Sequence, residues 1–280
     1  LDLTYFPEER GPYNYNPDAV PTGTLPNPQN NFGGIMRSLN STNFEQSNVE
    51  YIQFWMMDPY YDPENPGAAT DPTNGGQLYF NLGEISEDVL QDGRKFYENG
   101  LGPDQIVTNQ TWGNVPASQS LIYAFDTDTN TRNAQDVGYD GLSDVEEAAK
   151  FNAFASFTDP SADNYTYFLN TDGSVLERYK NYNNVQGNSP VDVTDTNRGS
   201  TTIPDVEDVN RDNTMNTINA YYEYKVNINT TGSLSNVGAN YITDIRETEV
   251  TAANGSPVKA RWIQFKIPVS APTNTIGSIS

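Results

Sequence analysis

The sequence predicts a mainly β protein, a jelly-roll-like β-sandwich with two or three short helices and long loops rich in Asp and Asn. Several segments alternate apolar and polar residues with the period of two that a strand buried on one face requires. The chain has 18 Tyr, 12 Phe and 3 Trp, which supply large rings for a core although only 35% of residues are hydrophobic. Pro, Asn and Gly accumulate between the alternating segments, where they favour turns and long connections. Short strands separated by such turns are typical of a sandwich.

Residues 51–57 and 78–85 carry the clearest strand patterns. Both alternating sets of residues 51–57 hold few charges, so we expect a strand that is covered on both faces. In residues 78–85, Leu78, Phe80 and Leu82 fall on one face, which indicates a half-buried strand.

Two segments carry helix signals. Ser86 is followed by two acidic residues, so we expect it to cap a helix over residues 86–100 that ends at a glycine. Ser143 and Glu146 have the spacing of a capping box, which predicts a helix over residues 143–154.

The remaining strands are predicted from weaker alternation and from turn residues. They lie at residues 1–6, 121–126, 165–169, 176–179, 221–228, 241–245 and 258–269. Residues 1–32 are expected to form an extended Pro/Asn-rich arm that Tyr13 and Tyr15 pin to the surface, with a disordered linker as the alternative. Residues 33–280 are expected to form a single β-sandwich domain with loop and helix insertions. No internal repeat is evident.

Charge and residue usage exclude several classes of function. The net charge of -22 repels phosphate backbones and anionic headgroups, so we expect no nucleic-acid partner and no polybasic membrane docking; cations are the natural partner. The absence of His and Cys excludes Ser-His-Asp and Cys-His catalysis, zinc sites that need those ligands, and disulfides. No apolar run approaches the roughly 20 residues of a membrane-spanning helix, so we expect the segment itself not to be membrane-inserted.

A first candidate calcium loop follows the spacing of a twelve-residue site. Its ligands would be Asp136, Asp140, the Leu142 carbonyl, Asp144 and Glu147, at positions 1, 5, 7, 9 and 12. Gly141 stands where the loop needs a left-handed residue. Position 3 is Gly138, so one ligand would come from water or from the acidic segment 126–130. The alternative is a plain turn whose acidic residues cap the following helix.

A second candidate calcium loop begins at Asp208. Its ligands would be Asp208, Asn210, Asp212, Thr214 and Asn216, at alternate positions. Position 6 is Asn213, which tolerates a left-handed backbone, but position 12 is Asn219 and supplies no carboxylate. We therefore expect weaker binding here, and an Asx-rich turn is the alternative.

Aromatic residues in loops form a candidate ligand platform. Tyr60, Tyr61 and Trp112 are predicted to lie in loops, where rings beside Asp and Asn often bind sugars. Trp55 and Trp262 lie within alternating strands, so we expect them in the core.

Several motifs together resemble one known family. They read EYIQFWMMDPYYDP, GGQLYFNLGEISEDVLQDGRKFYENG, TWGNVP, AFDTDTNTRNAQDVGYDGLSDVEE, ERYKNYNNVQGNSP, PDVEDVNRDNTMNTINAYYEYKV and RWIQFKIPV. The chain is similar in these motifs to the SprA family, outer-membrane translocons of the type IX secretion system that are also called gliding-motility or cell-surface proteins in Bacteroidetes. The similarity spans nearly the whole chain, but family members are very large single-chain β-barrels, so the chain would be one fragment.

The resemblance implies a non-catalytic domain of a protein-secretion translocon, in the extracellular cap or in a periplasmic insertion at the outer membrane or cell surface. Its implied partners are other secretion-system components, secreted cargo proteins and the rest of the parent barrel chain. A carbohydrate-binding module, or a carboxylate-dependent glycosidase, of a surface protein is the alternative. An adhesin fragment is a third.

Overall fold

The computed structural model describes residues 1, 3–39, 44, 46–64, 75–96, 107–117, 138–164, 173–175, 178, 206–228 and 234–279. Contacts divide the chain into two compact units. We call residues 1–38 with 87–217 the loop unit, and residues 39–86 with 218–280 the sheet unit. The chain passes between the units three times, after Ser38, Ser86 and Thr217, so residue 33 is not a boundary between them, and the loop unit includes the N-terminal arm.

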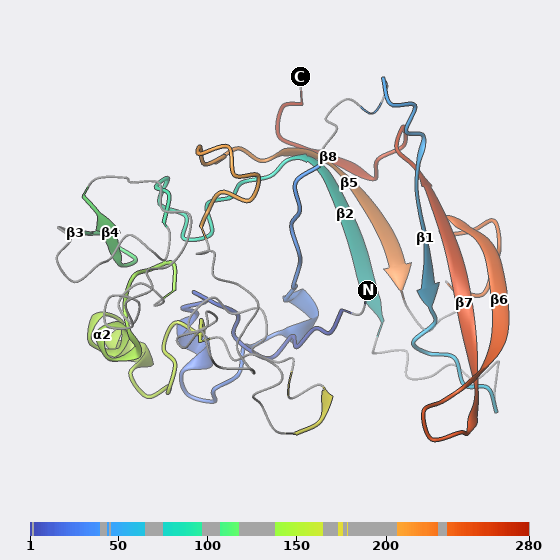
Figure 1. Ribbon diagram of the computed structural model, residues 1–280, viewed down its shortest axis with the longest axis horizontal. Coiled ribbons are helices and arrows are strands. Elements are labelled where there is room, and N and C mark those ends of the chain that lie inside the picture. The colour runs from blue at the N-terminus through green and yellow to red at the C-terminus, as the bar shows by residue number, and fades with distance from the viewer. Residues whose placement is uncertain are drawn as a thin grey trace, which may run out of the picture. The chain divides into compact units, whose positions relative to one another are not determined.

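The elements are short in the loop unit and long in the sheet unit (Figure 1). The strands are β1 (Tyr51–Met57), β2 (Gly76–Glu84), β3 (Val107–Asn109), β4 (Asn114–Pro116), β5 (Ala220–Ile228), β6 (Ile242–Thr251), β7 (Pro257–Pro268) and β8 (Asn274–Ile276). The helices are α2 (Asp144–Lys150) and the 3-10 turns η1 (Pro17–Ala19), η2 (Pro28–Asn30) and η4 (Asn152–Phe154).

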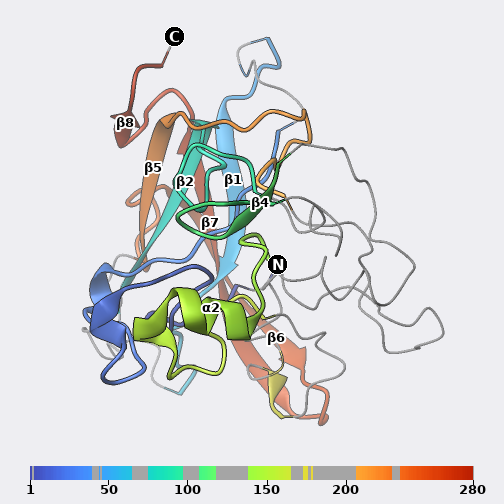
Figure 2. The ribbon, with the colours of Figure 1, turned by 90° about the vertical axis from the view of Figure 1, so that its left-hand side faces the viewer.

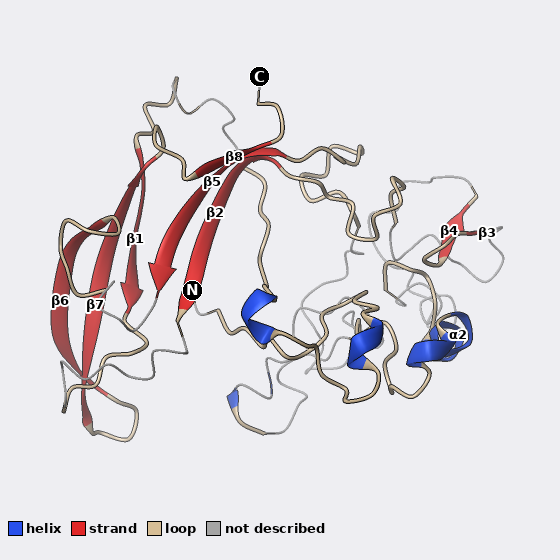
Figure 3. Cartoon of the chain, turned by 180° about the vertical axis from the view of Figure 1, so that it is seen from behind, coloured by secondary structure: helices blue, strands red, loops and turns tan. Residues whose placement is uncertain are grey.

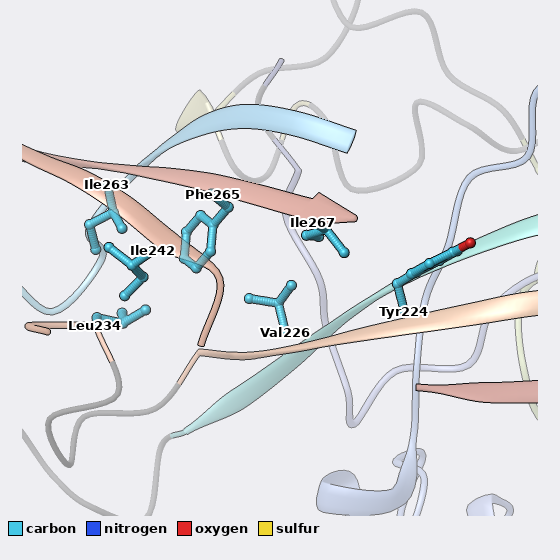
Figure 4. Close-up of a cluster of buried hydrophobic side chains, with 7 residues drawn as sticks. All are labelled: Tyr224, Val226, Leu234, Ile242, Ile263, Phe265 and Ile267. Atoms are coloured by element: carbon cyan, nitrogen blue, oxygen red, sulfur yellow. The ribbon is translucent and has the colours of Figure 1, made fainter. Parts of the chain in front are cut away.

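The sheet unit consists of two antiparallel sheets, with strand orders β1-β7-β6 and β2-β5-β8 (Figure 3). Their facing residues form one core, in which Val226 from β5 and Phe265 from β7 are fully buried (Figure 4). Phe54 of β1 contacts both Phe265 and Phe80 of β2, at ring separations of 5.0 and 5.1 Å. The protein is therefore mainly β with two packed sheets; the jelly-roll connection remains a prediction.

Five of the predicted strands match β1, β2, β5, β6 and β7 to within a few residues, although β6 continues to Thr251. Residues 3–6 form no strand, so that prediction is wrong. The predicted strands at 121–126 and 165–169 lie outside the described residues, as does nearly all of 176–179.

The outer face of β1 contradicts the prediction of a strand covered on both sides. Tyr51, Trp55 and Met57 are exposed, and Trp55 and Trp262, expected in the core, are 38% and 37% exposed. The lack of charged residues on β1 does not require burial, because cationic side chains of neighbouring strands can pack on its exposed rings. The Arg246 guanidinium lies 5.5 Å from the Trp55 ring, and the Lys266 ammonium lies 3.9 Å from the Tyr51 ring.

The helix predicted over residues 86–100 is also wrong for its described part. Residues 86–96 form bends and irregular loop, and the backbone at Gln91 has a φ of 48°, which a helix does not allow. The helix predicted over 143–154 is confirmed in a shorter form, as α2 followed by η4, with the capping box between Ser143 and Glu146.

A short repeat lies at both ends of the segment between β2 and β5. Residues 87–93 read EDVLQDG and residues 207–213 read EDVNRDN. In each copy the first Asp, Asp88 or Asp208, accepts hydrogen bonds from the backbone N–H groups four and five residues later. A residue with positive φ, Gln91 or Arg211, closes each loop around its carboxylate. The expectation of no internal repeat is therefore wrong. The repeat gives a weak signal because it is short and its copies stand far apart in the chain.

The two copies bind each other through equivalent positions. Glu207 accepts the N–H groups of Leu90 and Phe96 at 2.9 and 2.8 Å, and Glu87 accepts that of Asn216 at 3.0 Å. The backbone bonds are reciprocal as well, from the Glu87 N–H to the Asn216 carbonyl and from the Glu207 N–H to the Phe96 carbonyl. We call this arrangement the EDV clasp. It holds together the two ends of the long segment inserted between β2 and β5.

Candidate metal centre

Three buried carboxylates converge in the loop unit. Asp140 comes from the turn before α2, Glu147 from α2, and Asp163 from the loop after η4. One oxygen of each lies within 4.8 Å of the other two, and all three residues are fully buried. Ca²⁺ binds oxygens at about 2.3–2.6 Å, so ligands on opposite sides of an ion stand about 5 Å apart. The spacing therefore suits one ion that all three residues bind.

The local sequence explains why the carboxylates meet. Gly138 has a φ of +76°, and a Cβ there would overlap with the Asp163 carboxylate. Gly113 has no room for a side chain because the Asp140 carbonyl lies against it. That carbonyl accepts the N–H of Asn114 at 2.8 Å, which ties the turn to β4. Two glycines thus allow the backbone approach that buries Asp140 and Asp163.

Hydrogen bonds leave part of this cluster unsatisfied. Glu147 Oε1 and both Oδ atoms of Asp163 are buried without a hydrogen-bond partner among the described residues. The Tyr13 hydroxyl is close enough to lower the pKa of Asp163, but it does not reach hydrogen-bonding geometry with either oxygen. Buried carboxylate oxygens without partners are costly, and a bound cation satisfies them directly.

Burial and mutual repulsion disturb the ionisation of all three groups. Burial, followed by the charges of Asp140 and Glu147, raises the pKa of Asp163 to about 9. Burial raises the pKa of Glu147 to about 7, against the hydrogen bonds from Ser161. The pKa of Asp140 is raised well above its usual range by the same causes. A cation among them would favour the ionised forms instead.

A second group shares Glu147 with the first. Asp144, Glu147 and Asp159 also offer oxygens within 4.8 Å of one another, and Asp144 and Asp159 are half-buried. The carboxylates of Asp144 and Asp159 already have hydrogen-bond donors. Asp144 accepts from the Asn164 side chain, and Asp159 accepts the N–H groups of Asp163 and Asn164. The first group is therefore the stronger cation site.

The structure brings together part of the first predicted calcium loop. Asp140 and Glu147 meet as expected, and Asp144 joins through the second group. Leu142 is buried, and its N–H donates to Asp140. Asp136 lies outside the described residues. Asp159 and Asp163 were not among the predicted ligands. The sequence feature that could have indicated them is a second Asp-rich turn, DPSAD, shortly after the helix.

The second predicted loop uses its oxygens within itself. Both Asp208 oxygens accept backbone N–H groups, from Asp212 and Asn213, and the Asn210 side-chain oxygen also accepts from Asp212. The Asp212 carboxylate binds both the N–H and the hydroxyl of Thr214. Asn216 donates its N–H to Glu87 in the EDV clasp. Cation binding at this loop remains a prediction.

The predicted aromatic platform does not form one surface within either unit. Tyr60 is half-buried against the core of the sheet unit, and the Tyr61 ring carries the Arg261 guanidinium at 4.9 Å. Trp112, in the loop unit, is half-buried and stacks on Tyr15 at 5.7 Å.

Comparison with known families decides the relationship of the chain. The SprA_N family, described as motility related/secretion protein, matches residues 141–280, which is half of the sequence. The chain belongs to the SprA_N family. The SprA_N match includes Glu147, Asp163, the second copy of the EDV repeat and strands β5 to β8. The search of curated proteins finds no match to this SprA_N chain. No helix in its described residues has the length and apolar character needed to cross a bilayer.

Proposed function

We propose that this chain is a non-catalytic segment of a SprA-like outer-membrane translocon of type IX secretion, in the extracellular cap or in a periplasmic insertion. The SprA_N match carries the proposal, because the family is described by its role in motility and secretion. In this role its partners are the other components of the secretion system, the cargo proteins and the rest of the parent chain.

The acidic cluster supports a structural role over catalysis. A glycosidase needs a pair of carboxylates that a sugar can reach from solvent. Asp140, Glu147 and Asp163 are each fully buried, so a polymeric substrate has no access to them.

The second part of the proposal is that the Asp140, Glu147 and Asp163 cluster binds a divalent cation, with Ca²⁺ the best fit. The Glu147 Oε1 and Asp163 oxygens carry it, because they are buried without a hydrogen-bond partner among the described residues and a cation satisfies them directly. All ligands are oxygens, as Ca²⁺ prefers, and the cation would join α2 to the loops before and after it.

The role in secretion is tested in the bacterium that encodes the parent protein. Glu84 and Ala220 are paired residues of β2 and β5, so a short Gly/Ser linker can replace residues 87–217 and leave both strands in place. We expect cargo in the medium and gliding to fall at least tenfold while the parent protein stays at its normal level in the outer membrane. Normal export at normal parent level would refute the proposal.

Cation binding is tested by calorimetric titration of the 280-residue chain with calcium chloride, and by thermal unfolding with calcium or a chelator. We expect calcium to raise the unfolding midpoint, and Asp163→Asn to abolish that increase. Asp18→Asn is the matched control, since Asp18 is exposed on the arm. The metal proposal fails if calcium leaves the midpoint of the natural chain unchanged.

A carbohydrate-binding module is the second candidate, and one observation favours it. Tyr51, Trp55 and Trp262 expose their rings on one sheet of a sandwich, with Gln53 and Gln264 on the same face. Stacking rings beside amide groups are suited to sugars. A glycan array separates the two functions: selective binding that Trp55→Ala abolishes supports the module, and the absence of binding removes it.

A further inference from the structure

The N-terminal arm packs directly on the loop that supplies Asp163. The Tyr13 N–H donates to the Ser161 carbonyl at 2.7 Å. The Arg10 guanidinium donates to the carbonyls of Asp159 and Pro160, at 3.1 and 2.9 Å. The carbonyls of Asp159, Pro160 and Ser161 therefore all accept hydrogen bonds from the arm. Figure 2 shows the arm, in blue, beside α2.

Ser161 is bonded to the arm and to the cluster at once. Its N–H donates to Glu147 Oε2 at 2.9 Å, and its hydroxyl donates to Asp140 Oδ2 at 3.1 Å. The same hydroxyl oxygen lies 2.6 Å from the Tyr15 hydroxyl, which must be the donor because Ser161 gives its own proton to Asp140. Ser161 is fully buried, so water does not replace these bonds.

The Tyr13 ring makes a second connection. Its hydroxyl accepts the N–H of Tyr139 at 2.6 Å and lies close to the space that Gly138 leaves beside Asp163. Tyr13 also stacks on Tyr139 with ring centroids 5.8 Å apart. The arm thus contacts Tyr139, the residue after Gly138, as well as the loop of Asp163.

We propose that cation binding by Asp140, Glu147 and Asp163 is thermodynamically coupled to docking of the N-terminal arm, with Ser161 as the positioning residue that connects them. The inference rests on the proposed cation site. An ion bound by Asp140 and Glu147 fixes the positions of the two carboxylates that accept the bonds from Ser161. Ser161 is then held in the position that Tyr13 and Tyr15 require.

Coupling between two binding events is reciprocal. The cation therefore tightens the arm, and a docked arm tightens the cation by the same factor. The ion would therefore decide whether the arm is held on the loop unit or released.

The first measurement is hydrogen exchange of the full 280-residue chain with calcium chloride and with chelator. We expect exchange of the amides of residues 11–20, including that of Tyr13, to slow at least tenfold with calcium. Exchange in the core of β5 and β7 serves as the internal reference, since it lies in the sheet unit.

The second measurement is calorimetric calcium affinity of hydroxyl-deletion variants. Tyr15→Phe removes the bond to Ser161 without touching a ligand, and we expect roughly a fivefold to tenfold weaker affinity. Tyr5→Phe, on the same arm, is the matched control and should bind as the natural chain does. Ser161→Ala should weaken affinity further and remove the calcium effect on arm exchange.

The outcomes separate the two ideas. Calcium binding with unchanged arm exchange and unchanged Tyr15→Phe affinity overturns the coupling and leaves the cation site standing. No calcium binding by the natural chain overturns both. If Ser161→Ala fails to fold, Tyr15→Phe still decides, because its ring keeps its contacts with Trp112 and Phe151.

Discussion

At the scale of single residues, the candidate metal centre depends on glycines as much as on acids. Gly138 and Gly23 have nearly the same φ, +76° and +77°, but their surroundings differ. A Cβ at Gly138 would overlap with Asp163, whereas no described atom lies within 4 Å of the corresponding position at Gly23. The two positions separate backbone strain from steric exclusion.

We predict that Gly138→Ala destabilises the protein by about 2–4 kcal/mol and weakens calcium binding, because it adds a steric clash to the strained backbone. Gly23→Ala should cost only about 1 kcal/mol, from the backbone alone, and leave calcium affinity unchanged. Chemical denaturation and calcium titration of both variants provide the comparison. Equal effects of the two substitutions would contradict the packing shown around Asp163.

At the scale of elements, the EDV clasp replaces a predicted helix with a pair of side-chain-centred loops. Ser86 and the two acidic residues after it have the composition of a helix start, so the local sequence alone predicts a helix. The segment forms a loop instead, because Glu87 accepts hydrogen bonds from the distant loop that begins at Asp208. A side chain that serves backbone groups more than a hundred residues away gives no local signal.

We predict that Glu207→Ala lowers the free energy of unfolding by about 2–4 kcal/mol. The substitution leaves the buried N–H groups of Leu90 and Phe96 without their acceptors. Glu84→Ala, at an exposed position shortly before the clasp, should cost less than about 0.5 kcal/mol.

The reciprocal bonding also predicts how two substitutions combine. Glu87→Ala with Glu207→Ala should cost less than the sum of the single changes, because each loop loses its shape once the other has opened. A strictly additive double mutant, measured by urea denaturation, would show that the two loops are independent.

At the scale of the whole molecule, several of the acidic side chains that give the chain its negative charge are buried. Burial raises the pKa of Glu147 and of Glu207 to about 7 and that of Asp163 to about 9, from ordinary values of 4.5 and 3.8. A folded-state pKa above the unfolded value means that the folded state binds the proton more tightly. The stability contributed by these groups is complete below about pH 4 and is lost as pH rises through 7 to 9.

We therefore predict that the cation-free chain is more stable at pH 5 than at pH 9, and that calcium reverses this order because it takes the place of the protons. Urea denaturation at pH 5, 7 and 9, with calcium and with chelator, measures both trends. Glu207→Gln should remove part of the trend between pH 5 and 7 without affecting calcium binding. Constant stability of the chelated chain across this range would contradict the buried, unpaired state of the acids.

The sequence by itself determined the mainly β class, the positions of β1, β2, β5, β6 and β7, the start of α2 and the pairing of Asp140 with Glu147 at one site. These follow from alternation, capping and loop spacing, which are local. Only the tertiary structure decided that Asp163 completes the site, that Trp55 and Trp262 face outward, and that Glu87 and Glu207 each bond the loop of the other. Each of these depends on groups brought together from distant parts of the chain, and burial and charge pairing at such meetings leave no periodic trace in the sequence.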